Sequence, residues 1–143
     1  MINEITHSHL EIEVRLARAR AVVDAATVTP EAGATAAMDL VRRHLESLRS
    51  EVESHALYEE MKLFPALARI LGSSPPEVTR LIAEHGELSG MLDALDEAVA
   101  DGDAHLVSAR LHSFAAAFDR HSEDEANILD TTANLMDPGG PAA

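Results

Sequence analysis

His55-Ala-Leu-Tyr-Glu59 and His121-Ser-Glu-Asp-Glu125 repeat one pattern, a histidine followed four residues later by a glutamate. Each copy lies deep inside a segment whose apolar residues have helical spacing. Four residues of an α-helix turn about 400°, so the imidazole and the carboxylate lie about 40° apart and one turn from each other. Both side chains of a pair therefore point the same way. Two such pairs in matched helices suggest a metal site.

Two long helices are predicted in the N-terminal half of the chain. The first runs from about residue 2 to 26 and is followed by a loop over 27–35. The second runs from about residue 36 to 71, where Gly72 ends it and Pro65 should kink it. The apolar side chains expected to face inward are Ile5, Ile12, Leu16, Ala19, Val23, Leu45, Leu48, Val52, Leu63 and Ile70.

Two further helices are predicted in the C-terminal half. Ser74-Pro75-Pro76-Glu77 is a capping box with proline at the first helical position, and Gly102 ends the helix that it opens. Asp103 can cap the last helix, and residues 137–143 are expected to be a flexible tail. The inward apolar side chains are Leu81, Leu88, Leu92, Leu95, Val99, Leu111, Phe114, Phe118, Ile128 and Leu129.

Length and composition favour one all-α domain over residues 1–136. The chain has 143 residues, 46% of them hydrophobic but only 3% aromatic, which favours closely packed helices over a sheet. Four helices joined by short loops predict an antiparallel up-down four-helix bundle.

An internal repeat supports this bundle. Shifting the first helix by 76 residues places Ile5, His9 and Ile12 on Leu81, His85 and Leu88. Shifting the second helix by 66 residues places both His-x-x-x-Glu pairs on each other. We therefore expect two helical hairpins that form the halves of one bundle.

Charge and cysteine content limit the partners of the protein. The formal net charge of -14 would repel phosphate backbones and anionic membrane surfaces, so neither nucleic acid nor a membrane is an expected partner. The absence of cysteine excludes thiolate ligands and fits a reducing cytoplasm. No targeting or membrane-spanning segment is recognised. We expect a cytoplasmic protein that is a monomer or a weak dimer.

The repeat nominates six metal ligands, with at least one facing inward from each helix. They are His9, His55, Glu59, His85, His121 and Glu125. A lone inward histidine is commonly a hydrogen-bonded core residue, and a lone His/Glu pair is usually a surface contact. Four imidazoles and two carboxylates in one core favour a metal site, since unpaired buried carboxylates are costly. The competing hypothesis is a structural bundle with uncoordinated histidines or adventitious zinc.

Nitrogen and oxygen donors without sulfur suit iron, manganese or zinc. Carboxylates on opposite helices are placed to bridge two ions, which favours a dinuclear centre. With two bridging glutamates and one solvent bridge, these residues supply about ten of the roughly twelve bonds that two octahedral ions need. Two positions are therefore open or filled by another group, as binding of a small oxidant requires.

Four residues are candidates for an extra ligand or for a hydrogen bond to a ligand. Tyr58 lies about 60° from His55 around the helix, His44 about 20° but three turns earlier, and Glu60 about 140°. Tyr58 is the preferred ligand among them, and its alternative is an ordinary core tyrosine. Asp124 takes the place of Tyr58 in the second copy, so it could add an oxygen or orient a ligating histidine.

Only one of His7 and His9 can point inward, because two residues advance a helix by roughly 200°. His9 is chosen because the apolar stripe on its side is bulkier and because it matches His85 under the repeat. His7 remains the alternative ligand.

The chain resembles the hemerythrin-like, or HHE cation-binding, family, whose pattern is His, His-x-x-x-Glu, His, His-x-x-x-Glu over four helices. The match covers nearly the whole chain. The segment His55-Ala-Leu-Tyr-Glu59-Glu60-Met61-Lys62-Leu63-Phe64-Pro65 is similar to the family's second-helix signature. This resemblance implies a non-heme centre of two iron ions (Fe2+/Fe3+) with an oxo or hydroxo bridge. It also implies bridging roles for Glu59 and Glu125 and ligand roles for the four histidines.

One departure bears on function. The oxygen-carrying hemerythrins have a second histidine one turn after that of the third helix, but here Ser89 follows His85 by four residues. The expected function is therefore binding or reduction of a small oxidant (hydrogen peroxide, dioxygen or nitric oxide) rather than simple oxygen carriage. Whether this is enzymatic, as in catalase-like or nitric-oxide-handling activity, is left open. The alternative is a non-enzymatic protein that senses or stores oxygen or iron and acts through a partner.

Overall fold

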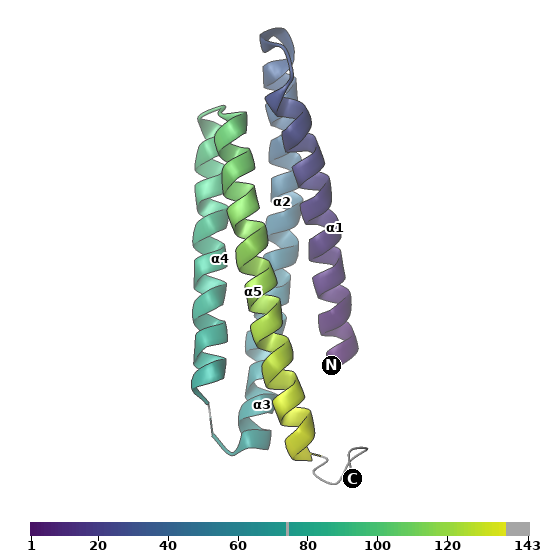
Figure 1. The fold of residues 1–143 in the computed structure, drawn as a ribbon, viewed down its shortest axis with the longest axis vertical. Helices are drawn as coiled ribbons and strands as arrows, with labels where there is room; N and C mark the ends of the chain where they lie inside the picture. The colour runs from purple at the N-terminus through teal and green to yellow at the C-terminus, as the bar shows by residue number, and fades with distance from the viewer. Residues whose placement is uncertain (74, 137–143) are drawn as a thin grey trace.

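The computed structural model describes residues 1–73 and 75–136, and these residues form an all-helical chain (Figure 1). The predicted fold class is confirmed, whereas the predicted tail at 137–143 lies outside the described residues. The elements are α1 (Ile2–Thr27), the 3-10 turn η1 (Glu31–Gly33), α2 (Ala34–Tyr58), the π-helical turn η2 (Glu59–Leu63), α3 (Phe64–Leu71), α4 (Pro76–Ala100) and α5 (Ala104–Met136).

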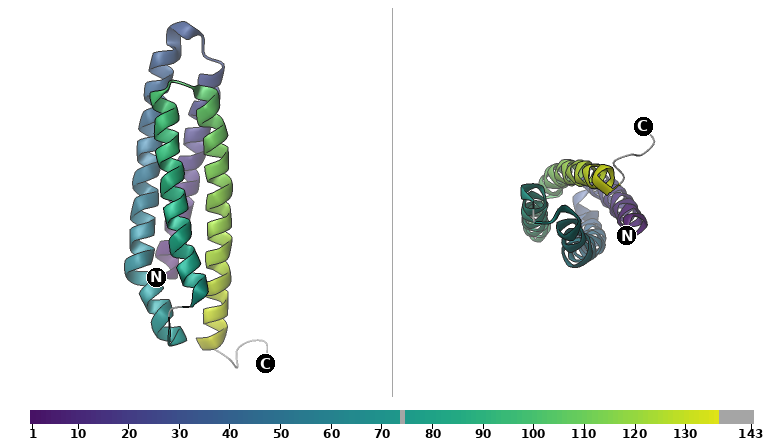
Figure 2. Two further views of the ribbon diagram at one scale, coloured as in Figure 1. Left: turned by 90° about the vertical axis from the view of Figure 1, so that its left-hand side faces the viewer. Right: turned by 90° about the horizontal axis from the view of Figure 1, so that it is seen from below.

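The long helices form a ring in which each one packs against its two neighbours. α1 packs on α2, α2 on α4, α4 on α5, and α5 on α1. Figure 2 shows the same order from below, with α5 between α4 and α1. Short connections between neighbours make their directions alternate, so the predicted up-down four-helix bundle is observed. The internal repeat stays a sequence prediction.

The apolar interior is divided into two clusters along the bundle axis. The larger one fills the end where α1 joins α2 and α4 joins α5, and it includes Leu48, Leu95 and Phe114. The smaller one lies at the opposite end and contains Ile5, Leu63, Phe64, Leu67, Val78, Leu81 and Ile128. The buried histidines and glutamates, namely His55, Glu59, Glu84, His85, His121 and Glu125, lie between the two clusters.

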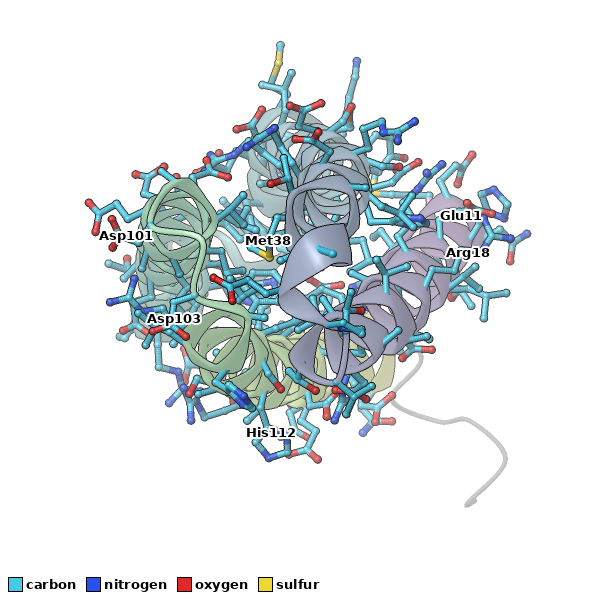
Figure 3. All side chains as sticks on the ribbon, turned by 90° about the horizontal axis from the view of Figure 1, so that it is seen from above. Glu11, Arg18, Met38, Asp101, Asp103 and His112 are labelled. Carbon is cyan, nitrogen blue, oxygen red and sulfur yellow. The ribbon has the colours of Figure 1, made fainter. Side chains whose placement is uncertain are left out.

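Many side chains at the rim of the bundle are charged or polar, as the view along its axis shows. In Figure 3, Met38 points into the interior while Asp101, Asp103 and His112 lie at the rim. Within the part of the chain that the structure describes, none of the helices is long and apolar enough to cross a membrane.

Pro65 has a stronger effect than the predicted kink. It lacks the N–H that would bond to the carbonyl of Met61, and its ring would crowd that carbonyl in a regular helix. The chain instead widens into the π-helical turn η2, in which the Phe64 N–H bonds to the carbonyl of Glu59, five residues earlier. The second predicted helix is thereby divided into α2, η2 and α3.

The predicted inward position of Ile70 is wrong, since this side chain is 45% exposed. The π turn holds one residue more than an α-helical turn, so the buried face of α3 moves forward by about one position. Phe64 and Leu67 occupy this face and are buried. A constant helical period, which the sequence prediction assumed, cannot represent such a shift.

The helix ends follow the expected capping with one difference. The Leu106 N–H donates to Asp103 Oδ1 at 3.0 Å, so Asp103 caps α5 as predicted. Gly102, with φ of 71°, adopts the left-handed conformation after α4 that favours glycine. Pro75 takes the N-cap position of α4 and Pro76 is its first helical residue, while Ser74 of the predicted capping box lies outside the described residues.

Replacing Asp103 with Ala should lower the free energy of unfolding by about 1 kcal/mol, because the first turn of α5 loses its side-chain acceptor. Urea unfolding measures this change. Asp101→Ala is the matched control, since Asp101 is an exposed acid of the same loop, and it should change stability by less than about 0.5 kcal/mol. Equal losses in the two variants would contradict a capping role for Asp103.

Candidate metal centre

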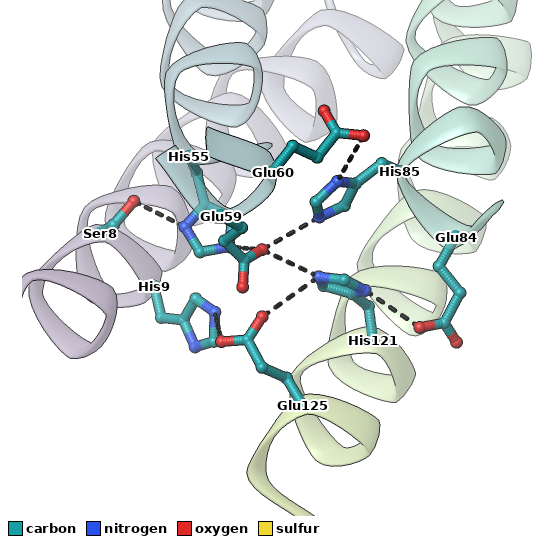
Figure 4. A network of polar contacts seen from close by, with 9 residues as sticks. All are labelled: Ser8, His9, His55, Glu59, Glu60, Glu84, His85, His121 and Glu125. Carbon is teal, nitrogen blue, oxygen red and sulfur yellow. Dashed lines mark hydrogen bonds and ion pairs between the residues drawn. The ribbon is translucent and has the colours of Figure 1, made fainter. Parts of the chain in front are cut away.

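The structure brings all six sequence-predicted ligands together between the two apolar clusters (Figure 4). They come from every side of the bundle: His9 from α1, His55 from α2, Glu59 from η2, His85 from α4, and His121 and Glu125 from α5. All except His9 are buried, and the side chain of His9 is 19% exposed.

Glu59 lies at the centre of this group, with no exposed surface. Its Oε1 atom lies 2.7 Å from His55 Nε2, 3.0 Å from His85 Nε2 and 3.3 Å from His121 Nε2. Three helices therefore direct the same ring nitrogen at one carboxylate oxygen. Burying a carboxylate and three imidazoles together costs free energy unless a positive charge compensates the carboxylate.

Glu125 spans the site from one side to the other. Its Oε1 atom lies 3.3 Å from His9 Nε2, while its Oε2 atom lies 3.5 Å from His121 Nε2. The two oxygens of this carboxylate thus face histidines of different helices. That is the arrangement expected of a carboxylate that bridges two ions.

The donor atoms fall into two groups that share Glu59. One group contains His9, His55, Glu59 and Glu125, and the other contains Glu59, His85 and His121. Within each group, one donor atom of every residue lies within 4.8 Å of the donor atoms of the others. Each group is thus compact enough to surround one cation.

Several of these donor atoms are buried without a hydrogen-bond partner among the described residues. They are His9 Nε2, His55 Nε2, Glu59 Oε2 and both carboxylate oxygens of Glu125. His55 Nε2 and Glu59 Oε1 are only 2.7 Å apart, yet they lack the geometry of a hydrogen bond. Unpaired buried polar atoms are rare, and here they surround a shared space. The donor set therefore fits a cation.

Comparison with known proteins agrees with this geometry. A family model described as the hemerythrin HHE cation binding domain matches residues 1–131. The chain belongs to this family. The domain is also similar to a probable vinculin from Dictyostelium discoideum, with 34% identity over 98 residues that cover 68% of this chain and 10% of that protein. No solved structure matches the domain significantly.

The chain spans about a tenth of the length of that curated relative. The match thus covers a small part of the larger protein. The family assignment of this HHE domain rests on the family model and on the buried donor set.

Electrostatics in the HHE domain favour an ionised Glu59. Burial alone would raise the pKa of this carboxyl, but the close imidazoles of His121, His55 and His85 outweigh this effect. The pKa of Glu59 is therefore held well below its usual value. The carboxylate keeps its charge at neutral pH, as a metal ligand must.

The histidines differ in their readiness to take a proton. Burial lowers the pKa of His9 and of His55, which keeps both imidazoles neutral and available to a cation. Burial would also lower the pKa of His121, but its contacts with Glu59 and Glu84 outweigh this and raise it. In the metal-free domain, His121 is thus protonated more readily than His9 or His55.

Aromatic rings close the site towards both apolar clusters. Phe118 lies edge-on to His9 with ring centroids 5.6 Å apart, on the side of the larger cluster. Phe64, which the π turn brings inward, stacks on His85 at 5.5 Å with an interplanar angle of 24°. These rings keep water from the donors and lower the local dielectric, which strengthens every charge interaction there.

Of the additional candidates, only Glu60 approaches a predicted ligand directly. Its Oε1 atom lies 3.7 Å from His85 Nδ1. Asp124 lies 3.7 Å from Arg80 rather than beside a histidine. Its link to the site runs through Glu84, whose pKa burial and Asp124 raise.

None of the other candidates forms a hydrogen bond or an ion pair with the donors in the described part of the chain. His7 is exposed, which supports the choice of His9 as the inward histidine. His44 lines a surface cavity of about 250 Å³ together with Arg18 and Arg43. Tyr58 packs against the smaller apolar cluster.

The sequence interpretation missed two residues that hold the histidines in place. Glu84 Oε1 lies 3.0 Å from His121 Nδ1, and Ser8 Oγ lies 2.9 Å from His55 Nδ1. Glu84 had a signal, because it lies three residues after Leu81 and four before Leu88, on the buried stripe of its helix. Ser8 had none, since serine next to a candidate ligand is unremarkable in sequence.

Replacing Glu125 with Met should raise the free energy of unfolding of the metal-free protein by about 1–3 kcal/mol, because two unpaired buried oxygens are removed. The same change should weaken metal binding, since the spanning carboxylate is lost. Urea unfolding and metal titration measure the two effects. Glu123→Met, at an exposed position of α5, is the control and should leave metal binding unchanged. A destabilised metal-free Glu125→Met protein would contradict this interpretation.

The pH dependence of the metal-free protein should differ between two histidine variants. His121 has a raised folded pKa, so its contribution to stability is present below the unfolded value of 6.5 and is lost as pH rises through the folded pKa. His121→Gln should therefore be most destabilising at acid pH. His55 has a lowered folded pKa, so the wild-type protein loses stability there as pH falls below 6.5, and His55→Gln should relieve this loss.

Urea unfolding from about pH 5 to about pH 9 measures both dependences. Stability differences from the wild type that are independent of pH in both variants would contradict the assignment.

Proposed function

We propose that this HHE domain is a non-heme di-iron protein that binds or reduces a small oxidant, namely hydrogen peroxide, dioxygen or nitric oxide. The four histidines would hold two iron ions, with His9 and His55 on one and His85 and His121 on the other. Glu59 and Glu125 would bridge the two ions. The cytoplasmic location and the monomeric or weakly dimeric state remain predictions from the sequence.

The observation that carries this proposal is the sharing of carboxylates between two donor groups. Glu59 belongs to both groups, and the two oxygens of Glu125 face histidines on opposite sides. A single ion would not need four imidazoles and two carboxylates in this arrangement. Nitrogen and oxygen donors in this ratio suit iron.

Two bound iron ions would supply one-electron chemistry between the ferrous and ferric states. The residues of the chain would bind the ions and exclude water from them. Because Glu59 is ionised and His55 is neutral, both side chains can bind a metal cation without first losing a proton. Phe118 and Phe64 exclude water from the donors. Most of the donor residues are buried, so a reacting molecule would have to be small.

A groove between α2 and α4 offers such a molecule a way to the site. It has a volume of about 490 Å³, and Ala56, Ile82, His85, Gly86 and Ser89 are among its lining residues. Ser89 stands where the oxygen-carrying hemerythrins are expected to have a further histidine. Here the exposed Ser89 lines the same groove as His85, which supports an open position beside His85.

Purified protein loaded with ferrous iron should bind about two iron ions per chain and change its visible spectrum when an oxidant is added. Metal analysis and spectra before and after peroxide, oxygen and nitric oxide provide the measurement. Less than one iron per chain would reject the di-iron assignment. Two irons with peroxide consumed only at the uncatalysed rate would reject catalase-like activity and favour oxygen or iron sensing through a partner.

Two neighbouring histidines provide the matched control for this experiment. His9→Ala removes an inward donor and should lower iron content, whereas His7→Ala removes an exposed ring and should leave iron content unchanged. The reverse result would assign the α1 ligand to His7.

A further inference from the structure

Two of the buried histidines are each held by an oxygen at the ring nitrogen that faces away from Glu59. His55 Nδ1 bonds to Ser8 Oγ at 2.9 Å, and His121 Nδ1 bonds to Glu84 Oε1 at 3.0 Å (Figure 4). When a neutral imidazole donates from Nδ1, the lone pair of its Nε2 points into the site. In His121 this form requires that a cation replace the proton through which Nε2 bonds to Glu59 Oε1. Both rings are thus oriented for binding a cation through Nε2.

These two supporting oxygens differ in charge and in depth. Ser8 offers a neutral hydroxyl, whereas Glu84 offers a carboxylate that is only 9% exposed. The remaining buried histidine, His85, has Glu60 Oε1 at 3.7 Å from its Nδ1, which is too long for a hydrogen bond, and Glu60 is 41% exposed there. Among the described contacts at Nδ1 of these rings, the His121–Glu84 pair is therefore the buried one with a carboxylate acceptor.

The position of Glu84 needs an explanation of its own. It lies on the core side of α4 beside His85, where a carboxylate without a partner would be costly. The acidic neighbour Asp124 disfavours the charge of Glu84. The contact that offsets this cost is the hydrogen bond donated by His121 Nδ1.

We propose that Glu84 is a positioning residue for the cation that His121 binds. By accepting from Nδ1–H, Glu84 fixes the ring with Nε2 towards Glu59 and Glu125, and its negative charge makes the imidazole a stronger donor. The cation position of His121 depends on this carboxylate, whereas that of His55 relies on a neutral hydroxyl. The two cation positions are thus chemically different. This inference rests on the proposed metal centre.

The physical basis is general. Carboxylates that accept from the outer nitrogen of a ligating histidine fix its tautomer and raise its basicity, and losing one typically costs 10–100-fold in metal affinity. The effect is larger in a site of low dielectric, such as this layer between apolar clusters. A stronger donor also favours the ferric over the ferrous ion.

The test is an anaerobic titration of the full-length, metal-free protein with ferrous ion in competition with a chelator. In Glu84→Ala, one of the two binding steps should weaken by about 10–100-fold. Glu84→Gln keeps an acceptor of the same shape without the charge, so the loss should be smaller. Glu87→Gln is the matched control, because it removes an exposed carboxylate from the same helix and should leave both steps unchanged.

The reduction potential of the iron-loaded protein separates positioning from a merely structural role. Glu84→Gln should raise the potential relative to both the wild type and Glu87→Gln, because the ferric state loses the nearby negative charge. A purely structural contact would leave the potential of this isosteric variant unchanged.

The possible results separate this inference from the proposed function. A wild-type protein that binds no iron overturns both. If the wild type binds two irons, then unchanged affinities and potential in Glu84→Gln and Glu84→Ala overturn the role of Glu84 alone. Equal weakening of both steps would also overturn it, since the effect would not belong to one position.

Discussion

Glu59 is a carboxylate without access to water that three imidazoles approach at once, and the alignment of the helices depends on this contact. His55, His85 and His121 place their Nε2 atoms 2.7 to 3.3 Å from one oxygen. Sliding any helix by one turn would leave its polar group against apolar side chains, at high cost. Apolar clusters above and below supply cohesion, while the polar layer sets the register.

Periodicity predicted the helices, the bundle and the cap at Asp103, because these depend on local spacing and on short loops. It also separated His9 from His7 through the bulk of the apolar stripes, and the structure places His9 inside. It failed at Ile70, because the π turn adds a residue and so changes the helical period. It overlooked Glu84, because His121, whose hydrogen bond compensates the burial of this carboxylate, lies on another helix. Ligand roles, iron and the internal repeat remain predictions.

The two donor groups have different needs in the absence of a cation. The unpaired atoms of His9, His55 and Glu125 belong to one group, so a cation there would satisfy donor atoms that no described residue satisfies. In the other group, His85 and His121 already bond to Glu59, and a cation would have to replace these bonds. The affinity of the first group for a cation therefore depends on its unpaired donor atoms. The affinity of the second group depends on competition with the hydrogen bonds to Glu59.

The extra residue in the π turn also allows α2 and α3 to have different rotational phases, which a regular helix would not. Before the turn, the phase of α2 is set by His55 and the cores around it; after the turn, the phase of α3 is set by Phe64 against His85. A single uninterrupted helix could satisfy one phase but not the other. The π turn therefore uncouples the two helices. Substitutions that rotate α3 can be accommodated at the turn without rotating the part of α2 that carries His55.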